Sequence, residues 1–338
     1  MITQLAKLFA LFIALSLVAT QCNNSTPEPA PDDGAGKTFK MAAIFPGVIT
    51  DADYNTLGYI GLTSVQSDLG VKTAYSESVA VPDVERVMRE YIDDGFNIIF
   101  THGGQFLSQT QTLAKEFPDV YFIGESDAAP DDAPENLWVI DRNFHVGFYP
   151  LGTLAAQQTK TGKIGYIGGL TLPFSYAEVH AIKQAIADAG ADVEVVSVWA
   201  GNFNDPTRAR ELADAMIADN VDVIIGSLNL GMFGLFEAVK ASDNKALAIA
   251  KYTDKSNFAP DNYITSVLYD FSGPLKNIVK DIQSGKTGGY YPLGFDTGVT
   301  IQMPLKNVTD GVEASIKQVV ADIESGKTEV KKDVTPIE

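Results

Sequence analysis

The body of the chain alternates short apolar runs with longer stretches in which apolar residues recur at helical spacing. The runs at residues 98–100 and 223–225 contain only isoleucine, valine and phenylalanine, and a stretch with helical spacing follows each of them. Continuous apolar strands are typical of parallel sheets that helices cover on both faces. The pattern therefore predicts an α/β fold built from repeated strand–helix units.

Two series of predicted strands and helices occupy residues 41–249. The predicted strands lie at residues 41–45, 71–75, 98–101, 121–124, 164–168, 193–198, 223–226 and 247–249. The predicted helices lie at residues 54–68, 84–94, 107–117, 177–189, 207–219 and 232–240. Gly70, Gly95 and Gly190 follow three of these helices, as expected of glycine at a helix C-terminus.

The division of this pattern near residues 141–147 predicts two doubly wound lobes with parallel sheets. The remainder, from residue 263, contains only a strand, a helix at 274–284, a strand at 299–303 and a helix at 311–325, which is too little for a third domain. We therefore expect these pieces to complete both lobes, with crossovers near residues 143–147, 266–270 and 295–305. Three crossing strands make a hinge, and a ligand is expected in the cleft between the lobes. The predicted N-terminal lobe comprises residues 38–145 and 268–298, and the predicted C-terminal lobe comprises residues 146–267 and 299–330.

The amino terminus has the features of an export signal. Lys7 precedes an apolar run at residues 8–19, which is the length of a signal core and too short to cross a bilayer. Cys22, the one cysteine of the chain, follows the run directly, as in a bacterial lipoprotein signal at residues 1–22. Ordinary signal cleavage that leaves a thiol is the alternative. Residues 23–37 are polar and rich in proline and glycine, which predicts a flexible tether between a lipid anchor in the membrane and the folded body.

Composition excludes several classes of function. The formal net charge of the 338-residue chain is -18, and no basic face that would bind nucleic acid is visible. One cysteine and three widely spaced histidines exclude structural zinc, so we expect no metal and no cofactor. The sequence lacks dinucleotide-binding, phosphate-loop, serine-hydrolase and zinc-protease motifs, and we do not expect an enzyme. The segment His102-Gly103-Gly104 follows a predicted strand; its glycines either let the backbone approach a ligand or only turn the chain.

The loops that follow the predicted strands carry aromatic rings together with amides and carboxylates. In open α/β sheets, ligands bind beyond the carboxyl ends of the strands. Rings can stack on a flat heterocycle while amides bind its edge. For any single ring, the alternative is that it only covers the core. The candidate ligand-binding residues are Asp51, Tyr54, Asn55, Gln105, Phe106, Gln109, Phe174, Trp199, Phe203, Asn229, Tyr252, Asp254, Tyr269 and Asp270.

Several of these loops resemble the basic membrane protein family of bacterial lipoproteins, which includes purine-nucleoside receptors of ABC importers. The resemblance spans residues 40–327 approximately. It rests on DADYN at 51–55 with Gly-Leu at 61–62, YPLGTLAA at 149–156, GYIGG at 165–169 and WAGNFND at 199–205. It implies the type I periplasmic-binding fold, with two parallel-sheet lobes joined by a three-strand hinge. It also implies a small-molecule ligand and a membrane permease as partner.

The chain departs from the family pattern at positions that hold the ligand. The aspartate and the lysine with which family receptors bind ribose align with Tyr252 and Tyr269. An acidic residue that reads the base aligns with Gln109 or Thr110, and a family glutamate aligns with Val146. The resemblance therefore supports a binding scaffold but leaves the ligand open.

The sequence thus predicts an exported, lipid-anchored, monomeric solute-binding protein of an ABC importer for a purine nucleobase, nucleoside or similar flat heterocycle. One alternative is a lipoprotein that senses its ligand and reports to a membrane receptor, and another is a flavin-type ligand in the same cleft. A nucleoside-processing enzyme would need a catalytic base and a phosphate or metal site, and we find neither in the sequence.

Overall fold

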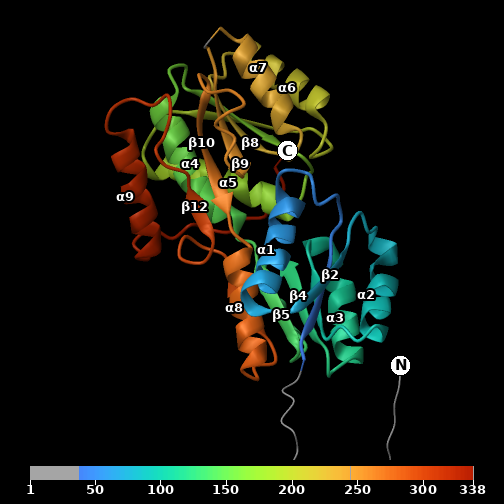
Figure 1. The fold of residues 1–338 in the computed structure, drawn as a ribbon. Helices are drawn as coiled ribbons and strands as arrows, with labels where there is room; N and C mark the ends of the chain where they lie inside the picture. The colour runs from blue at the N-terminus through green and yellow to red at the C-terminus, as the bar shows by residue number, and fades with distance from the viewer. Residues whose placement is uncertain (1–37, 244, 338) are drawn as a thin grey trace, which may run out of the picture. The chain divides into compact units, whose positions relative to one another are not determined.

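The computed structural model describes residues 38–243 and 245–337, which form two α/β lobes (Figure 1). The predicted signal segment 1–22 with Cys22 and the predicted tether 23–37 lie outside the described residues. Within the described part of the chain, each lobe contains one six-stranded sheet. The fold class predicted from the sequence is confirmed.

The first lobe is built on the sheet with strand order β11-β5-β4-β3-β1-β2, in which every pairing is parallel. Its strands are β1 (Lys40–Ile44), β2 (Lys72–Ser76), β3 (Ile98–Thr101), β4 (Tyr121–Ser126), β5 (Leu137–Asp141) and β11 (Gly289–Pro292). Its helices are α1 (Tyr54–Leu69), α2 (Val84–Asp93), α3 (Leu107–Glu116) and α8 (Ser272–Gln283).

The second lobe is built on the sheet with strand order β12-β10-β9-β8-β6-β7, parallel except for the antiparallel edge strand β12. Its strands are β6 (Lys163–Gly168), β7 (Glu194–Trp199), β8 (Val223–Ser227), β9 (Leu247–Tyr252), β10 (Tyr263–Tyr269) and β12 (Val299–Ile301). Its helices are α4 (Phe144–Gln158), α5 (Pro173–Asp188), α6 (Pro206–Ala218), α7 (Met232–Ala241) and α9 (Val312–Glu324).

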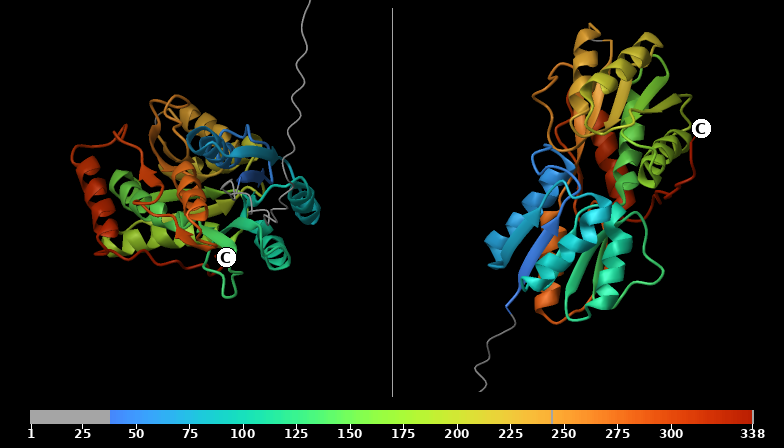
Figure 2. Two further views of the ribbon diagram at one scale, coloured as in Figure 1. Left: turned by 60° about the horizontal axis from the view of Figure 1, so that its bottom comes forward. Right: turned by 90° about the vertical axis from the view of Figure 1, so that its right-hand side faces the viewer.

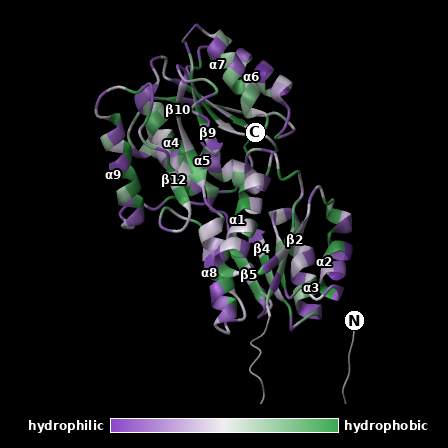
Figure 3. Ribbon diagram, viewed as in Figure 1, coloured by the Kyte–Doolittle hydropathy of each residue, from purple (hydrophilic) through white to green (hydrophobic). Residues whose placement is uncertain are grey.

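Burial explains why the central strands are apolar on both sides. Successive strand residues point to opposite faces, so Met41 and Ala43 of β1 join one core cluster and Ala42 and Ile44 join another. All four side chains are fully buried. Figure 2 shows helices on both faces of each sheet, and Figure 3 shows hydrophobic and hydrophilic residues mixed along helices such as α2 and α9.

Strands β5 and β11 are absent from the sequence prediction. Strand β5 (LWVID) is wholly buried, but it lies beside the predicted lobe division, where the alternation of strands and helices is interrupted. Strand β11 (GYYP) is mostly exposed at a sheet edge and lacks an apolar pattern. The chain crosses between the sheets after β5, after β10 and between β11 and β12, which gives the three-strand hinge.

Strand order places one topological switch point in each lobe. In the first lobe the chain passes from central strand β1 to edge strand β2 and returns to β3 on the other side of β1. The second lobe repeats this arrangement with β6, β7 and β8. The loops after β1, β3, β6 and β8 therefore border the crevices in which open α/β sheets bind ligands.

The carboxyl-terminal segment after α9 returns to the second lobe's helix α5 and to the hinge. The backbone N–H of Lys331 donates to Gln184 Oε1 at 3.0 Å, and the Thr335 carbonyl contacts His180 Nε2 at 2.9 Å. Lys332 donates to both carboxylate oxygens of Asp141 at 2.8 and 2.7 Å. No helix in residues 38–243 or 245–337 combines the length and apolarity needed to cross a membrane.

Candidate ligand-binding cavity

A cavity of about 410 Å³ lies between residues of the two lobes, at the loops that border the switch points. This volume lies in the range of small-molecule sites. Its lining residues are Pro46, Gly47, Tyr54, Asn55, Gln105, Arg142, Leu170, Leu172, Phe174, Phe203, Asn204, Asn229 and Tyr252. Arg142 is the only charged side chain in this set.

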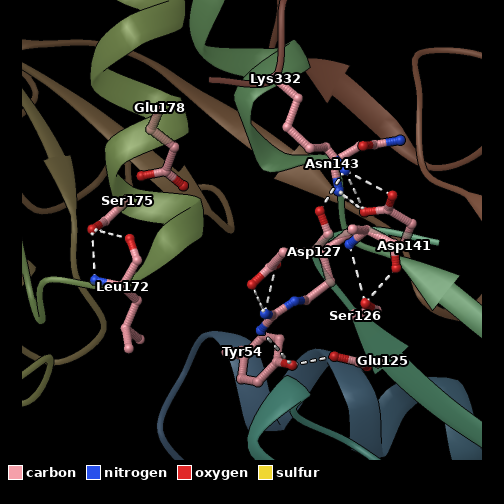
Figure 4. A network of polar contacts seen from close by, with 12 residues as sticks. Tyr54, Glu125, Ser126, Asp127, Asp141, Asn143, Leu172, Ser175, Glu178 and Lys332 are labelled. Carbon is pink, nitrogen blue, oxygen red and sulfur yellow. Dashed lines mark hydrogen bonds and ion pairs between the residues drawn. The ribbon is translucent and has the colours of Figure 1, made fainter. Parts of the chain in front are cut away.

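The first-lobe wall of the cavity contains a buried chain of polar groups. His102 contacts Glu125 Oε1 through Nδ1 at 2.6 Å and the Tyr54 carbonyl through Nε2 at 2.8 Å. The Tyr54 hydroxyl donates to the other carboxylate oxygen of Glu125 (Figure 4), and its ring stacks on His102 at 3.9 Å. Burial and the neighbouring Glu125 carboxylate raise the pKa of Tyr54, so its hydroxyl stays protonated. His102 and Glu125 thus fix the ring of Tyr54 against the cavity.

Arg142 lies next to this chain and is held by Asp127. Its Nη2 donates to both carboxylate oxygens of Asp127 at 2.6 Å, while Nη1 is 3.5 Å from the Tyr54 hydroxyl. Burial acts to lower the pKa of Arg142, but Asp127, Tyr54 and Glu125 raise it on balance, so the guanidinium remains charged. A Cβ at Gly104 would lie 2.9 Å from Nη2, so a side chain at this position would displace the guanidinium. Gly103 has a φ of 134°, so one glycine turns the chain and the other makes room for the guanidinium.

Asp51 organises the amides at the start of α1. Its carboxylate accepts from the backbone N–H groups of Asp53, Asn55 and Thr56 at 3.0–3.1 Å. It also accepts from Asn55 Nδ2 at 2.8 Å and, across the lobes, from Asn229 Nδ2 at 3.4 Å. Asp51 therefore caps the helix and orients two amides that line the cavity.

The second-lobe wall is aromatic. Phe174 and Phe203 stack with ring centroids 6.2 Å apart, and Phe144 packs edge-on against Phe174 at 5.6 Å. A Cβ at Gly169 would lie 2.1 Å from the Phe203 ring, so only glycine fits there. Tyr252 ends β9 with a φ of 76°, a left-handed conformation that is uncommon for a large side chain and typical of functional sites.

A second buried ion pair lies behind this aromatic wall. Lys251 Nζ donates to Glu178 Oε1 at 2.6 Å, and the Tyr166 hydroxyl donates to Glu178 Oε2 at 2.7 Å. Both charged side chains are fully buried. The ammonium lies 3.8 Å from the centroid of Phe144 and 4.9 Å from that of Phe174. Burial lowers the pKa of Lys251 to about 8, although Glu178 opposes the shift.

Buried polar contacts also join the two lobes beside the cavity. Lys255 Nζ of the second lobe donates to Asp53 Oδ1 of the first at 2.5 Å, and Thr253 donates to Asp53 at 3.1 Å. Both charged side chains are at most 3% exposed. Burial raises the pKa of Asp53 to about 7, against the opposing effect of Lys255.

The structure brings half of the candidate residues to the cavity. Tyr54, Asn55, Gln105, Phe174, Phe203, Asn229 and Tyr252 line it. Their role in binding stays a prediction.

The other candidates do not line the cavity. Phe106 is fully buried in the core of the first lobe, and Tyr269 is buried with its hydroxyl donating to the Phe144 carbonyl. Asp254 and Asp270 are exposed and accept from backbone N–H groups in their own turns. The remaining three candidates are Asp51, Gln109 and Trp199. Asp51 acts through the amide of Asn55, which it orients, and Trp199 Nε1 donates to Ser175. Aromatic and polar residues after a strand thus include core and turn-capping residues as well as cavity residues.

Arg142 and the Lys251–Glu178 pair are absent from the sequence prediction. Arg142 directly follows β5, so recognition of that apolar strand would have placed it at a strand end. Lys251 lies within a strand that is otherwise apolar, and a charge in that position is a signal of a buried partner. No group of three or more His, Cys, Asp or Glu side chains among the described residues is placed to hold a metal.

A family model described as ABC transporter substrate-binding protein PnrA-like (Bmp) matches residues 38–333. The chain belongs to the PnrA-like family of ABC transporter substrate-binding proteins. The resemblance drawn from the loop motifs is therefore confirmed. This PnrA-like chain is 25% identical to basic membrane protein A2 of Borrelia garinii over 84% of its own length and 82% of that protein. It is 26% identical to a purine-binding protein of Brucella abortus, over 76% of its own length and 72% of that protein.

Solved structures show the same fold. A solute-binding protein of an ABC transporter system from Aeropyrum pernix aligns with a TM-score of 0.75 at 20% identity, over 87% of this chain and 94% of that one. A comK transcriptional activator from Bacillus halodurans aligns with a TM-score of 0.73 at 23% identity, over 86% and 99% of the two chains. The periplasmic-binding fold of this PnrA-like protein is thus shared by proteins with different roles.

Proposed function

We propose that this PnrA-like protein is the extracytoplasmic solute-binding component of an ABC importer and binds a purine-type heterocycle between its lobes. The observation that carries the proposal is the cavity, in which the rings of Tyr54, Phe174, Phe203 and Tyr252 occur with the amides of Asn55 and Asn229. Rings supply stacking faces for a flat ligand, and amides supply donors and acceptors for its edge. The purine-binding relative in Brucella abortus supports the same ligand class.

The polar lining favours a free nucleobase over a nucleoside. Ribose hydroxyls are bound most strongly by charged partners, because charge-assisted hydrogen bonds are about twice as strong as neutral ones. No carboxylate and no lysine is among the described residues that line the cavity, and their one charged side chain is Arg142, so no carboxylate is present there to accept from the ribose hydroxyls. Asp254 and Asp270, which could replace the family aspartate, are exposed and bound to their own turns. Tyr252 lines the cavity, whereas Tyr269 is buried outside it.

Calorimetric titration of hypoxanthine against inosine, and of adenine against adenosine, tests this proposal. We expect the better-bound base to bind at least as tightly as its nucleoside. A nucleoside preference of tenfold, which is ~1.4 kcal/mol, would show that ribose is held. If a sugar or an amino acid stabilised the protein and none of these purines did, the proposal that the ligand is a purine-type heterocycle would be refuted.

The proposal includes attachment to the membrane through a lipid on Cys22. We expect Cys22→Ser to move the protein from the membrane fraction to the soluble fraction, because the variant lacks the cysteine to which the lipid would be attached. The measurement is immunoblotting of separated fractions. Equal attachment of the variant and the parent would argue against lipidation.

A ligand-sensing role is the second candidate function, because one relative is named for a regulatory activity and not for transport. The transcriptional activator Med of Bacillus subtilis is 25% identical over 88% of this chain and 89% of its own. Neighbouring genes separate the two roles, because an importer requires a permease and an ATPase whereas a sensor requires a receptor.

A further inference from the structure

The cavity presents one permanently charged group to a ligand, the guanidinium of Arg142. The other twelve lining residues, all within the described part of the chain, are apolar, aromatic, tyrosine or amide residues. Arg142 itself is only 6% exposed. A ligand in this cavity therefore meets a positive charge that is largely removed from water, where a hydrogen bond to it is strong.

The guanidinium is fixed in place but keeps hydrogen-bond capacity. Asp127 takes both hydrogen bonds from Nη2 at 2.6 Å, and the ring of Phe174 lies 5.3 Å from the guanidinium carbon. Nη1 has only the 3.5 Å approach to the Tyr54 hydroxyl, which is too long for a strong hydrogen bond. Arg142 can therefore donate from Nη1 to a ligand while Asp127 holds its orientation.

Of the four amides that line the cavity, Asn55 and Asn229 are less free to bind a ligand edge with a donor and an acceptor together. Asn55 Nδ2 donates to Asp51 at 2.8 Å, and Asn229 Nδ2 is directed to the same carboxylate at 3.4 Å. Paired amide donors and acceptors are what recognise the N6/N7 edge of adenine, whereas arginine recognises the O6/N7 edge of guanine. The charged donor of Arg142 resembles the second case, while Gln105, Asn204 and Asn55 Oδ1, which has no hydrogen-bond partner among the described residues, are left for other atoms of the ligand.

We infer that Arg142 selects ring ligands that present an oxo group, so that the cavity prefers 6-oxopurines to 6-aminopurines. An oxo group at C6 accepts a hydrogen bond from Arg142 Nη1. An amino group in the same position is itself a donor, so its N–H groups would face the N–H groups of the guanidinium. The inference rests on the proposed function, since it requires a purine-type ligand. It assigns the discrimination to a residue outside the loop motifs that carry the family resemblance.

The test compares hypoxanthine with adenine, which differ at C6, and uses unsubstituted purine as the reference. With the wild-type protein, calorimetric titration should give a dissociation constant for hypoxanthine at least tenfold below that for adenine, with purine between them. In the double variant Arg142→Gln/Asp127→Asn, which removes both charges and leaves no unpaired carboxylate, the hypoxanthine preference should fall below threefold.

Two further variants keep the result interpretable. Arg89→Gln/Glu116→Gln removes a bidentate arginine–carboxylate pair on the exposed surface of the first lobe and should leave both affinities unchanged. If the buried double variant does not fold, Arg142→Lys retains a cation opposite Asp127 and should still reduce the preference, because lysine lacks the planar fork.

The outcomes separate the inference from the proposed function. Adenine binding as tightly as hypoxanthine, or tighter, would overturn the role of Arg142 while leaving a purine-binding protein. A hypoxanthine preference that persists in folded Arg142 variants would also overturn it, because another group would then read the oxo position. Binding of none of the three rings would overturn both.

Discussion

Each lobe has a buried ion pair beside the cavity, and the two pairs differ in what surrounds the cation. In the first lobe Arg142 lines the cavity, and its partner Asp127 has a side chain that is 24% exposed. In the second lobe Lys251 and Glu178 are both fully buried, and aromatic rings enclose the ammonium. Charge near a cavity is thus not sufficient for ligand contact. The first pair has donors left for a ligand, whereas the second fixes the aromatic wall from behind.

The largest effect on stability is expected from breaking the second-lobe pair. Lys251→Met leaves Glu178 as an uncompensated charge in a fully buried site, and removal of one partner of a buried pair typically costs about 3–5 kcal/mol. Lys251→Met/Glu178→Leu removes both charges and should recover most of that loss. The measurement is the free energy of unfolding from denaturant titration of the three proteins.

The first-lobe pair supplies the comparison for this experiment. Arg142→Met should cost less stability than Lys251→Met, because water can reach part of the Asp127 carboxylate. A double variant at positions 251 and 178 that is no more stable than Lys251→Met would show that the ion pair itself, and not the unpaired charge, stabilises the second lobe.

The repeating pattern was sufficient to predict most of the fold, because alternating apolar strands and amphipathic helices follow from burial of a parallel sheet on both faces. The two strands that it missed had other determinants. Strand β5 was obscured by the lobe division, and β11 is an exposed edge strand that pairs with β5 only after the chain has returned from the second lobe. Such pairing depends on tertiary structure and leaves no local pattern.

The cavity was predicted less completely, because position after a strand does not determine where a side chain points. Tyr252 and Tyr269 both end a strand, yet Tyr252 has a left-handed φ of 76° and lines the cavity, whereas Tyr269 packs in the core. Asp51 and Asp270 were candidates as carboxylates, but each accepts backbone N–H groups at the start of a helix. Helix capping and ligand binding call for the same residue types, and only the structure separates them.

A third buried pair, Asp53–Lys255, extends the comparison to the contact between the lobes. Burial raises the Asp53 pKa from 3.8 to about 7, so between these pH values the folded protein holds a proton that the unfolded chain releases. The resulting contribution to stability is full below about pH 4 and is lost as the pH rises through about 7, by at most ~1.4 kcal/mol per pH unit. We expect the unfolding free energy of wild type, minus that of Asp53→Asn, to fall by roughly 2–4 kcal/mol from pH 4 to pH 7.

The difference between the two proteins is needed because another group titrates in the opposite sense. Burial lowers the pKa of His145 from 6.5 to about 4, with a smaller effect of Lys332. This group makes stability rise with pH in nearly the same window, and the subtraction removes it. A difference that does not change with pH would mean that Asp53 is not buried at the contact between the lobes in solution.

The smallest effect on stability is expected at Lys332, which pairs with Asp141, because only the anion of this pair is buried. The Lys332 side chain is 25% exposed, whereas that of Asp141 is 2% exposed (Figure 4 shows the contact). Lys332→Met removes two hydrogen bonds to Asp141 and one to the Asp127 carbonyl, but Asp141 still accepts from the Tyr290 hydroxyl and from the Asn143 N–H. Because Asp141 keeps these partners, we expect a loss of about 1–2 kcal/mol in unfolding free energy.

Lys331→Met, in the exposed neighbouring residue, is the control and should lose less than ~0.5 kcal/mol. Equal losses in the two variants would show that the carboxyl-terminal segment does not hold Asp141 in solution, and a loss at Lys332 equal to that at Lys251 would mean that burial of the anion alone sets the cost.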